Sequence, residues 1–158
     1  MTDGRPTGAD ANRLADLLPH RPPMVLIDEV VSYAGDEKRL TAAVTVKPGW
    51  CENWTAIEFM AQTAAALVGT IDREEHPGDK PRPGFLLGSR RLDLRIERFA
   101  VGVRYLVTAQ AVFSDGAAAS FACEILSPAG ECVARATLNA FRPDSLADFL
   151  SNEKGNEN

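Results

Sequence analysis

The stretch AIEFMAQTAAALVG, residues 56–69, decides the fold of this chain of 158 residues. Met60, Ala64 and Val68 recur at helical spacing, and most of the positions between them are alanine or other small and apolar residues. A helix with such side chains on nearly every face is typical of a buried position. Glu58, in its first turn, is then a charge that the fold must compensate or use.

Composition bounds the possible functions. Apolar residues make up 45% and charged residues 25% of the chain, as in ordinary globular proteins of one domain. The net charge of −5 disfavours a nucleic-acid partner. The three cysteines are odd in number and form no CxxC motif, which argues against a disulfide framework and a zinc site, and we expect no metal and no cofactor.

No pattern in the sequence predicts a membrane span or a signal peptide. The most apolar run is too short to span a bilayer, and the first residues, MTDGRPTGADAN, have no signal-peptide pattern. We therefore expect a cytoplasmic protein that does not enter a membrane.

The rest of the chain predicts strands on both sides of the helix. We expect a disordered segment at 1–11, one domain at 12–143 and a polar tail at 144–158, with a short helix at 12–18. Strands are predicted at 24–33 and 40–46, the buried helix at 55–71, and further strands from 85, at 105–111, 118–126 and 132–141. Turn residues at 114–116 and 127–130 predict antiparallel hairpins. One antiparallel sheet wrapped around one central helix, an α+β architecture, satisfies this order.

Three motifs carry a resemblance to a known family. LPHRPPMVLIDEV at 18–30, AIEFMAQTAA at 56–65 and GFLLGSRRLDLRIERFAVG at 84–102 resemble segments of the hotdog-fold β-hydroxyacyl-ACP dehydratases. The similarity covers about residues 14–142 and is closest to the short accessory dehydratase-like proteins of aryl-polyene pathways. It implies a hotdog fold, a catalytic role for Glu58, and a 3-hydroxyacyl thioester of acyl carrier protein or coenzyme A as substrate.

One departure from this family bears on catalysis. The standard dehydratases carry a Gly-His-Phe-Pro-Gly loop before the helix, and its histidine is the catalytic base. Here the link at 47–57 reads KPGWCENWTAI and contains no histidine. His20, which the family also has in a structural position, either takes over as the base or keeps that structural role.

Two residues of the helix have alternative roles. Thr55 to Glu58 fits the T-x-x-E capping box, in which the glutamate satisfies a backbone amide, and this role can coexist with catalysis. Gln62 lies four residues after Glu58 on the same face, as a satisfied core group or as a substrate contact. We further expect an apolar substrate tunnel along the helix, lined by Met60, Ala61, Ala64, Phe85 and Leu86, with Gly88 as a further substrate-binding residue.

A dense basic run follows in the third segment. Arg90, Arg91, Arg95 and Arg98 form either a solvated strand face, interleaved with acids, or a docking surface for an acidic acyl carrier protein or coenzyme A phosphates.

Three functions stay open on the sequence. The first is dehydration of 3-hydroxyacyl-ACP, the second is a hotdog thioesterase in which Glu58 activates water, and the third is a non-catalytic partner of an active dehydratase. We expect a homodimer, or a pair with a related hotdog subunit, because a curled sheet leaves open edges that proteins normally cover.

Overall fold

The structure, a computed structural model, describes residues 14, 17, 18, 24–78, 84–115 and 117–142. The predicted segments at 1–11 and 144–158 lie outside these residues, as do His20 and most of the short helix predicted at 12–18. Leu14 and Leu17 are helical and buried.

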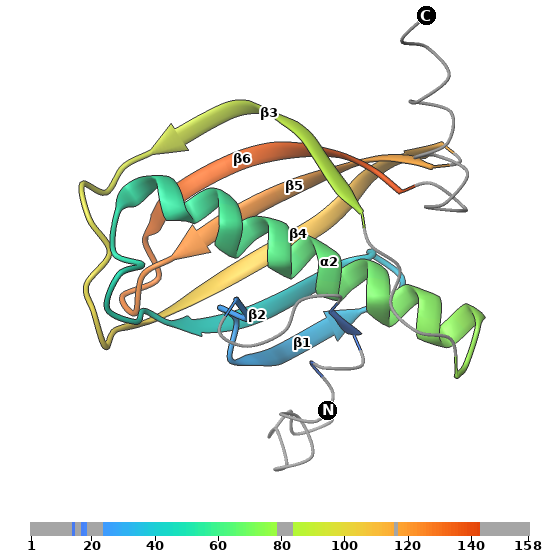
Figure 1. Cartoon of the computed structure of the whole chain (residues 1–158), viewed down its shortest axis with the longest axis horizontal. Helices are drawn as coiled ribbons and strands as arrows, with labels where there is room; N and C mark the ends of the chain where they lie inside the picture. Colours follow the sequence, from blue (N-terminus) through green and yellow to red (C-terminus); the bar gives the residue numbers. More distant parts are fainter. Residues whose placement is uncertain (1–13, 15–16, 19–23, 79–83, 116, 143–158) are drawn as a thin grey trace, which may run out of the picture.

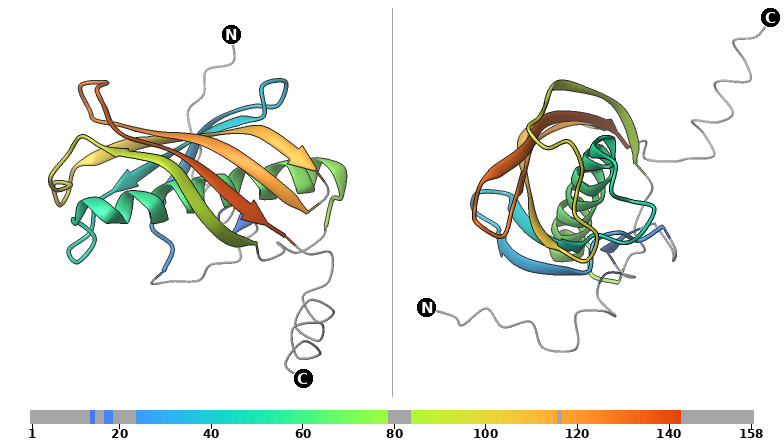
Figure 2. Two further views of the ribbon diagram at one scale, coloured as in Figure 1. Left: turned by 90° about the horizontal axis from the view of Figure 1, so that it is seen from above. Right: turned by 90° about the vertical axis from the view of Figure 1, so that its left-hand side faces the viewer.

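One long helix and one sheet make up most of the described part of the chain (Figure 1). The elements are β1 (Glu29–Ala34), β2 (Arg39–Thr45), the short 3₁₀-helix η1 (Asn53–Thr55), α2 (Ala56–Glu75), β3 (Phe85–Leu94), β4 (Arg104–Asp115), β5 (Ala118–Leu126) and β6 (Cys132–Phe141). The six strands form one sheet in the order β1-β2-β4-β5-β6-β3, and every pairing is antiparallel. Seen along the helix, the sheet curls around α2 (Figure 2). The predicted α+β architecture is confirmed.

The hairpins follow the predicted turn residues. The turn between β5 and β6 closes with the Gly130 amide donating to the Ser127 carbonyl at 2.8 Å, and Gly130 has a φ of 83°. Glycine adopts this left-handed conformation without the steric cost of a side chain. The local sequence therefore determines this hairpin.

The first strand is shorter than predicted. β1 begins at Glu29, whereas the sequence pattern predicts a strand from Met24. The Leu26 amide donates to the Gln62 side-chain oxygen at 2.8 Å. Residues 24–26 are thus fastened to the helix by a side chain, where the pattern predicts sheet pairing, and backbone bonding to β2 begins with the Asp28 amide, which donates to the Ala43 carbonyl at 2.8 Å.

The helix is one turn longer than predicted. It runs to Glu75, because the polar residues Asp72 to Glu75 continue it beyond the apolar stretch. Its buried face packs mainly on β2 and β4 and less on β5 and β6. The core around it contains Phe59, Met60 and Leu67, each at most 1% exposed. The helix therefore sits off the centre of the sheet, closer to the β1 side than to the β3 side.

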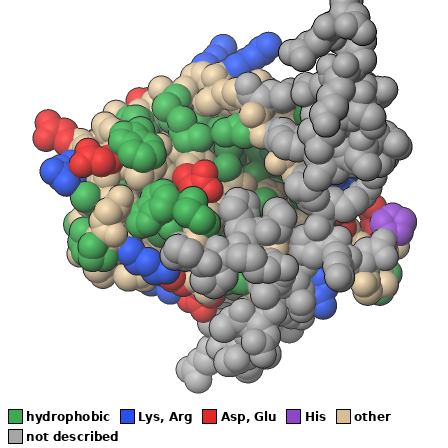
Figure 3. Space-filling view, viewed as in Figure 1, with side chains coloured by type: hydrophobic (Ala, Val, Ile, Leu, Met, Phe, Trp, Pro, Cys, Tyr) green, Lys and Arg blue, Asp and Glu red, His purple; other side chains and the backbone are tan. Residues whose placement is uncertain are grey.

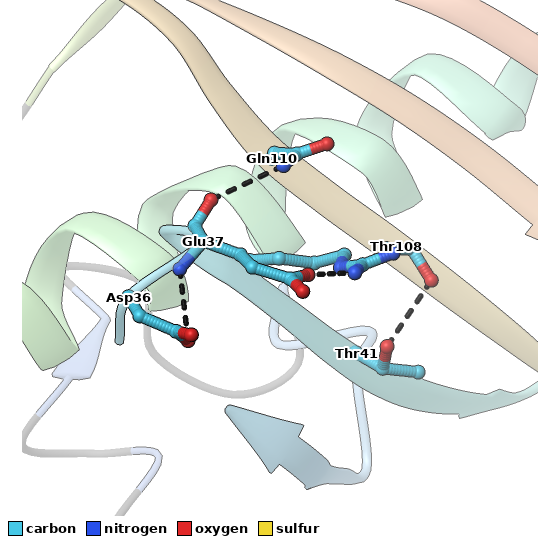
Figure 4. A network of polar contacts seen from close by, with 6 residues as sticks. Asp36, Glu37, Thr41, Thr108 and Gln110 are labelled. Carbon is cyan, nitrogen blue, oxygen red and sulfur yellow. Dashed lines mark hydrogen bonds and ion pairs between the residues drawn. The ribbon is translucent and has the colours of Figure 1, made fainter. Parts of the chain in front are cut away.

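The outer face of the sheet carries a polar network (Figure 4). The Gln110 amide donates to the Glu37 carbonyl at 3.2 Å, and the hydroxyls of Thr41 and Thr108 lie 3.1 Å apart. The Glu37 amide donates to the Asp36 carboxylate at 3.0 Å. These contacts fasten the β1–β2 hairpin to β4.

Candidate active site

An apolar cavity of about 480 Å³ runs along α2. This volume lies within the range of small-molecule sites in proteins. From the helix it is lined by Glu58, Ala61, Ala64, Ala65, Val68, Gly69, Ile71, Asp72 and Glu75, and from the sheet by residues that include Leu86, Ala111, Ala119, Phe121, Leu138 and Ala140. α2 packs more closely on β2 and β4 than on β5 and β6. The cavity lies on the side of the looser packing, where the small side chains of the helix leave space next to the sheet.

Of the residues predicted to line a tunnel, the structure brings three to this cavity. Ala61, Ala64 and Leu86 line it, whereas Met60 is fully buried in the core and is not part of the lining. Phe85 begins β3, but its side chain lies outside the described part, and Gly88 is paired with Asn139 of β6. Substrate binding by these residues stays a prediction. For Met60, burial in the core argues against contact with a substrate in this cavity.

Glu58 lies in the first turn of α2 at one end of the cavity. Gln62 donates to its carboxylate at 3.0 Å. The same Gln62 nitrogen donates to the Met24 carbonyl at 2.6 Å, while the Gln62 oxygen accepts from the Leu26 amide at 2.8 Å. Gln62 is 0% exposed, and both of its amide hydrogens have protein acceptors. This geometry favours the interpretation of Gln62 as a satisfied core group that positions Glu58.

The capping box predicted at Thr55 does not form on the threonine side. The Thr55 hydroxyl donates to the carbonyls of Glu52 at 2.6 Å and Trp50 at 3.1 Å, and makes no cap bond to α2. The reason is that η1 runs directly into α2, so Thr55 itself has helical dihedral angles. An N-cap residue normally has extended angles that aim its oxygen at the helix amides. The Ala56 amide also donates to the carbonyls of Asn53 and Trp54, which removes it from the donors expected at the helix start.

Hydrophobic side chains lie at the surface on the face that carries the helix (Figure 3). Trp54, four residues before Glu58, is 60% exposed, and Leu86 is 45% exposed. Leu86 also lines the cavity, and exposed apolar side chains gathered on one face are typical of a surface that another molecule covers.

The four predicted docking arginines are all exposed. Arg95 pairs with Asp93 at 3.0 Å, and Arg98 pairs with Glu52 at 3.2 Å and donates to the Cys51 sulfur at 3.0 Å. Arg90 and Arg91 lie on β3 at a bulge where Arg91 adopts a φ of 55°. Two of the four are thus partly engaged in local ion pairs, and their role in docking stays a prediction.

No helix in the described part of the chain is long and apolar enough to cross a bilayer. Within the same residues, no three His, Cys, Asp or Glu side chains gather where they could hold a metal ion.

A six-stranded antiparallel sheet curled around one helix, with a carboxylate at the helix start and an apolar cavity along the helix, defines a hotdog-fold protein. The chain belongs to the ApeP-like family, described as ApeP dehydratase, whose model matches residues 12–151. The chain is thus a dehydratase-like protein, and the resemblance drawn from its three motifs is confirmed.

Solved structures agree with this assignment. The dehydratase heterocomplex ApeI:P from Xenorhabdus doucetiae is 25% identical, with a TM-score of 0.78 over 87% of this chain and 95% of that one. A hypothetical thioesterase with coenzyme A from Streptococcus pneumoniae is 12% identical, with a TM-score of 0.56 over 73% and 84% of the chains. The sigma28-regulated virulence protein Cj0977 of Campylobacter jejuni is 11% identical, with a TM-score of 0.64 over 88% and 94%. The last two share the fold alone. Among curated proteins, none matches this chain.

Proposed function

We propose that this chain is a subunit of a dehydratase that removes water from 3-hydroxyacyl thioesters, and that Glu58 is its proton donor. The observation that carries the proposal is the place of Glu58, at the end of an apolar cavity and held there by Gln62. The family assignment supports the same reaction.

The reaction needs three groups around the substrate. A base takes the proton from Cα, an acid gives a proton to the leaving β-hydroxyl, and hydrogen-bond donors stabilise the charge on the thioester oxygen. The products are a 2-enoyl thioester and water. Glu58 supplies the acid, and backbone amides of the first turn of α2 after Ala56 supply the donors. The acyl chain lies along the small residues of the cavity.

The base has two candidate sources. His76 ends the helix and is exposed. It follows Glu58 by 18 positions, which is about 27 Å along a helix, so it is too far away to act on the same substrate. His20 of this chain is one candidate, and a side chain from a partner subunit at the mouth of the cavity is the other.

A partner subunit is supported by the exposed edge of the sheet. In the described part of the chain, β3 pairs with β6 alone, and Leu86 and Leu92 on β3 are 45% and 38% exposed. An open edge with apolar side chains is a site for pairing with another chain. Because the similar structure from X. doucetiae is a heterocomplex, we propose a related hotdog subunit as the partner, with a homodimer as the alternative.

The carrier of the substrate is part of the same proposal. Acyl carrier protein, which is acidic, or the phosphates of coenzyme A would be attracted by the basic side chains of Arg90, Arg91, Arg95 and Arg98.

The cytoplasmic location of the protein stays a prediction.

The experiment compares two reactions, with and without a partner. Purified protein is given 3-hydroxyacyl and saturated acyl thioesters, first alone and then with a related hotdog subunit. Formation of the enoyl thioester is the expected result. Release of free thiol without water loss would contradict the proposal and favour the thioesterase. No feature of this site specifically supports a thioesterase. Activity that appears only with the partner and survives Glu58→Gln would make this chain the non-catalytic subunit.

The source of the base is tested by His20→Ala. A loss of rate of about 100-fold or more with an unchanged melting temperature makes His20 the base. A fall in melting temperature with an unchanged rate makes it structural, and the base then belongs to the partner.

A further inference from the structure

Both ends of the cavity along α2 are charged, while its middle is apolar. Asp72 follows Glu58 by 14 positions, which corresponds to about 21 Å along the helix. Between them, Ala61, Ala65 and Val68 present small apolar side chains to the same cavity. The Glu58 end would hold the reacting carbons, so the Asp72 end would receive the far end of the acyl chain.

Asp72 forms an ion pair with Arg142 at this far end of the cavity. Arg142 directly follows β6, and its guanidinium contacts both carboxylate oxygens of Asp72, with Nη2 3.2 Å from Oδ1. The two side chains are only 25% and 20% exposed, and both residues line the cavity. A bidentate pair of this kind holds both partners in a fixed plane. It therefore fastens α2 to the sheet at the charged end of the cavity, which Lys38 and Glu75 also line.

The pair has a consequence for chain length. Each methylene that enters the apolar part gains about fourfold in affinity from burial. A methylene that reaches the pair would instead strip water from two charges, or separate them, and lose this gain. We propose that the Asp72–Arg142 ion pair sets the longest acyl chain that the cavity accepts. This inference rests on the proposed function, since it assumes an acyl chain in the cavity.

The test measures binding, which does not depend on turnover. Saturated acyl-pantetheine thioesters of increasing length are titrated calorimetrically into the full-length protein, first alone and then assembled with a related hotdog subunit. For the wild type, we expect affinity to rise by about fourfold per methylene up to a limiting length and then to level off or fall. In Asp72→Ala/Arg142→Ala, the rise should continue to chains longer than the wild-type limit.

The matched control removes an ion pair away from the cavity. Glu124 and Arg135 pair at 3.0 Å between β5 and β6, with side chains 44% and 55% exposed, and neither lines the cavity. Glu124→Ala/Arg135→Ala should keep the limiting length of the wild type. A shift of equal size in this control would overturn the assignment to Asp72 and Arg142.

Failure of the inference and failure of the proposed function give different results. If the wild type binds but the limiting length is the same without the ion pair, the inference is wrong and the proposed function stands. If no chain length binds to the wild type, both are wrong. Should the double alanine variant not fold, Asp72→Asn/Arg142→Gln, which keeps the side chains close to their original size and removes both charges, must also move the limit to longer chains. An unchanged limit in that variant overturns the inference.

Discussion

Gln62 offers the sharpest test of how this site is built. Its side chain is 0% exposed and links Glu58 to residues 24–26, which precede β1. Gln62→Leu removes all three hydrogen bonds at nearly constant volume. The Leu26 amide is then left buried without its partner, since Leu26 is 2% exposed, whereas Met24, at 46% exposed, can turn its carbonyl to water.

The expected loss of stability follows from these contacts. An unpaired buried amide costs about 1–3 kcal/mol, and the more apolar leucine returns part of this cost. We therefore expect the free energy of unfolding to fall by about 2 kcal/mol, which for a chain of this size lowers the melting temperature by about 4–8 °C. Chemical denaturation and thermal melting measure both quantities.

The same variant should slow the reaction beyond its effect on stability. Glu58 loses a hydrogen bond that orients its carboxylate, and misplacement of a catalytic group by about 1 Å can cost up to about 100-fold in rate. We expect a fall in kcat of about 10-fold or more, with a smaller change in KM, measured well below the melting temperature.

A matched control and a second substitution sharpen the test. Gln110→Leu removes a single hydrogen bond near the surface, to the Glu37 carbonyl, and should change stability by no more than about 0.5 kcal/mol. Gln62→Glu places a carboxylate oxygen beside Met24 and Glu58, which raises the pKa of the introduced carboxyl. Because its folded-state pKa lies above the unfolded value, this variant should lose stability relative to the wild type as the pH rises above the unfolded-state pKa of a glutamate. A Gln62→Leu variant as stable and as active as the Gln110→Leu control would refute the positioning role.

Three further predictions concern single residues. Glu58→Gln should lower the rate by about 100-fold or more while the melting temperature changes little, because glutamine can still accept the hydrogen bond from its neighbour; an unchanged rate in the assembled complex would rule out a catalytic role. Gly69→Ala should destabilise the protein by about 1–3 kcal/mol in denaturant titrations, because a Cβ there would lie 2.3 Å from the Leu17 carbonyl oxygen. This loss should exceed the gain from alanine as the better helix former. A stabilised variant would show that Leu17 does not pack on the helix. Burial raises the pKa of the Cys123 thiol to about 12. Near pH 8, Cys123 should therefore resist alkylation, while the half-buried Cys51 and Cys132 react. Labelling followed by mass spectrometry distinguishes the three, and rapid modification of Cys123 in the folded protein would contradict its burial.

Local patterns predicted the elements well wherever neighbours in sequence decide them. The hairpins at β4–β5 and β5–β6 follow from alternating apolar residues and from turn residues such as Gly130, whose conformation depends on the residue itself. Where a distant group intervened, the prediction was wrong. β1 starts five residues later than expected because Gln62, 36 positions beyond Leu26, takes its amide.

The site divides in the same way. The sequence by itself determined the buried helix, the place of Glu58 in its first turn, and the face it shares with Gln62, because helical geometry fixes positions three and four residues apart. The tertiary structure decided which residues of that face meet a cavity and which, like Met60, meet the core. It also decided the pairing of Asp72 with Arg142, which lie 70 positions apart. Such contacts depend on how the helix settles against the strands, a balance of packing over the whole sheet that no local stretch of residues contains.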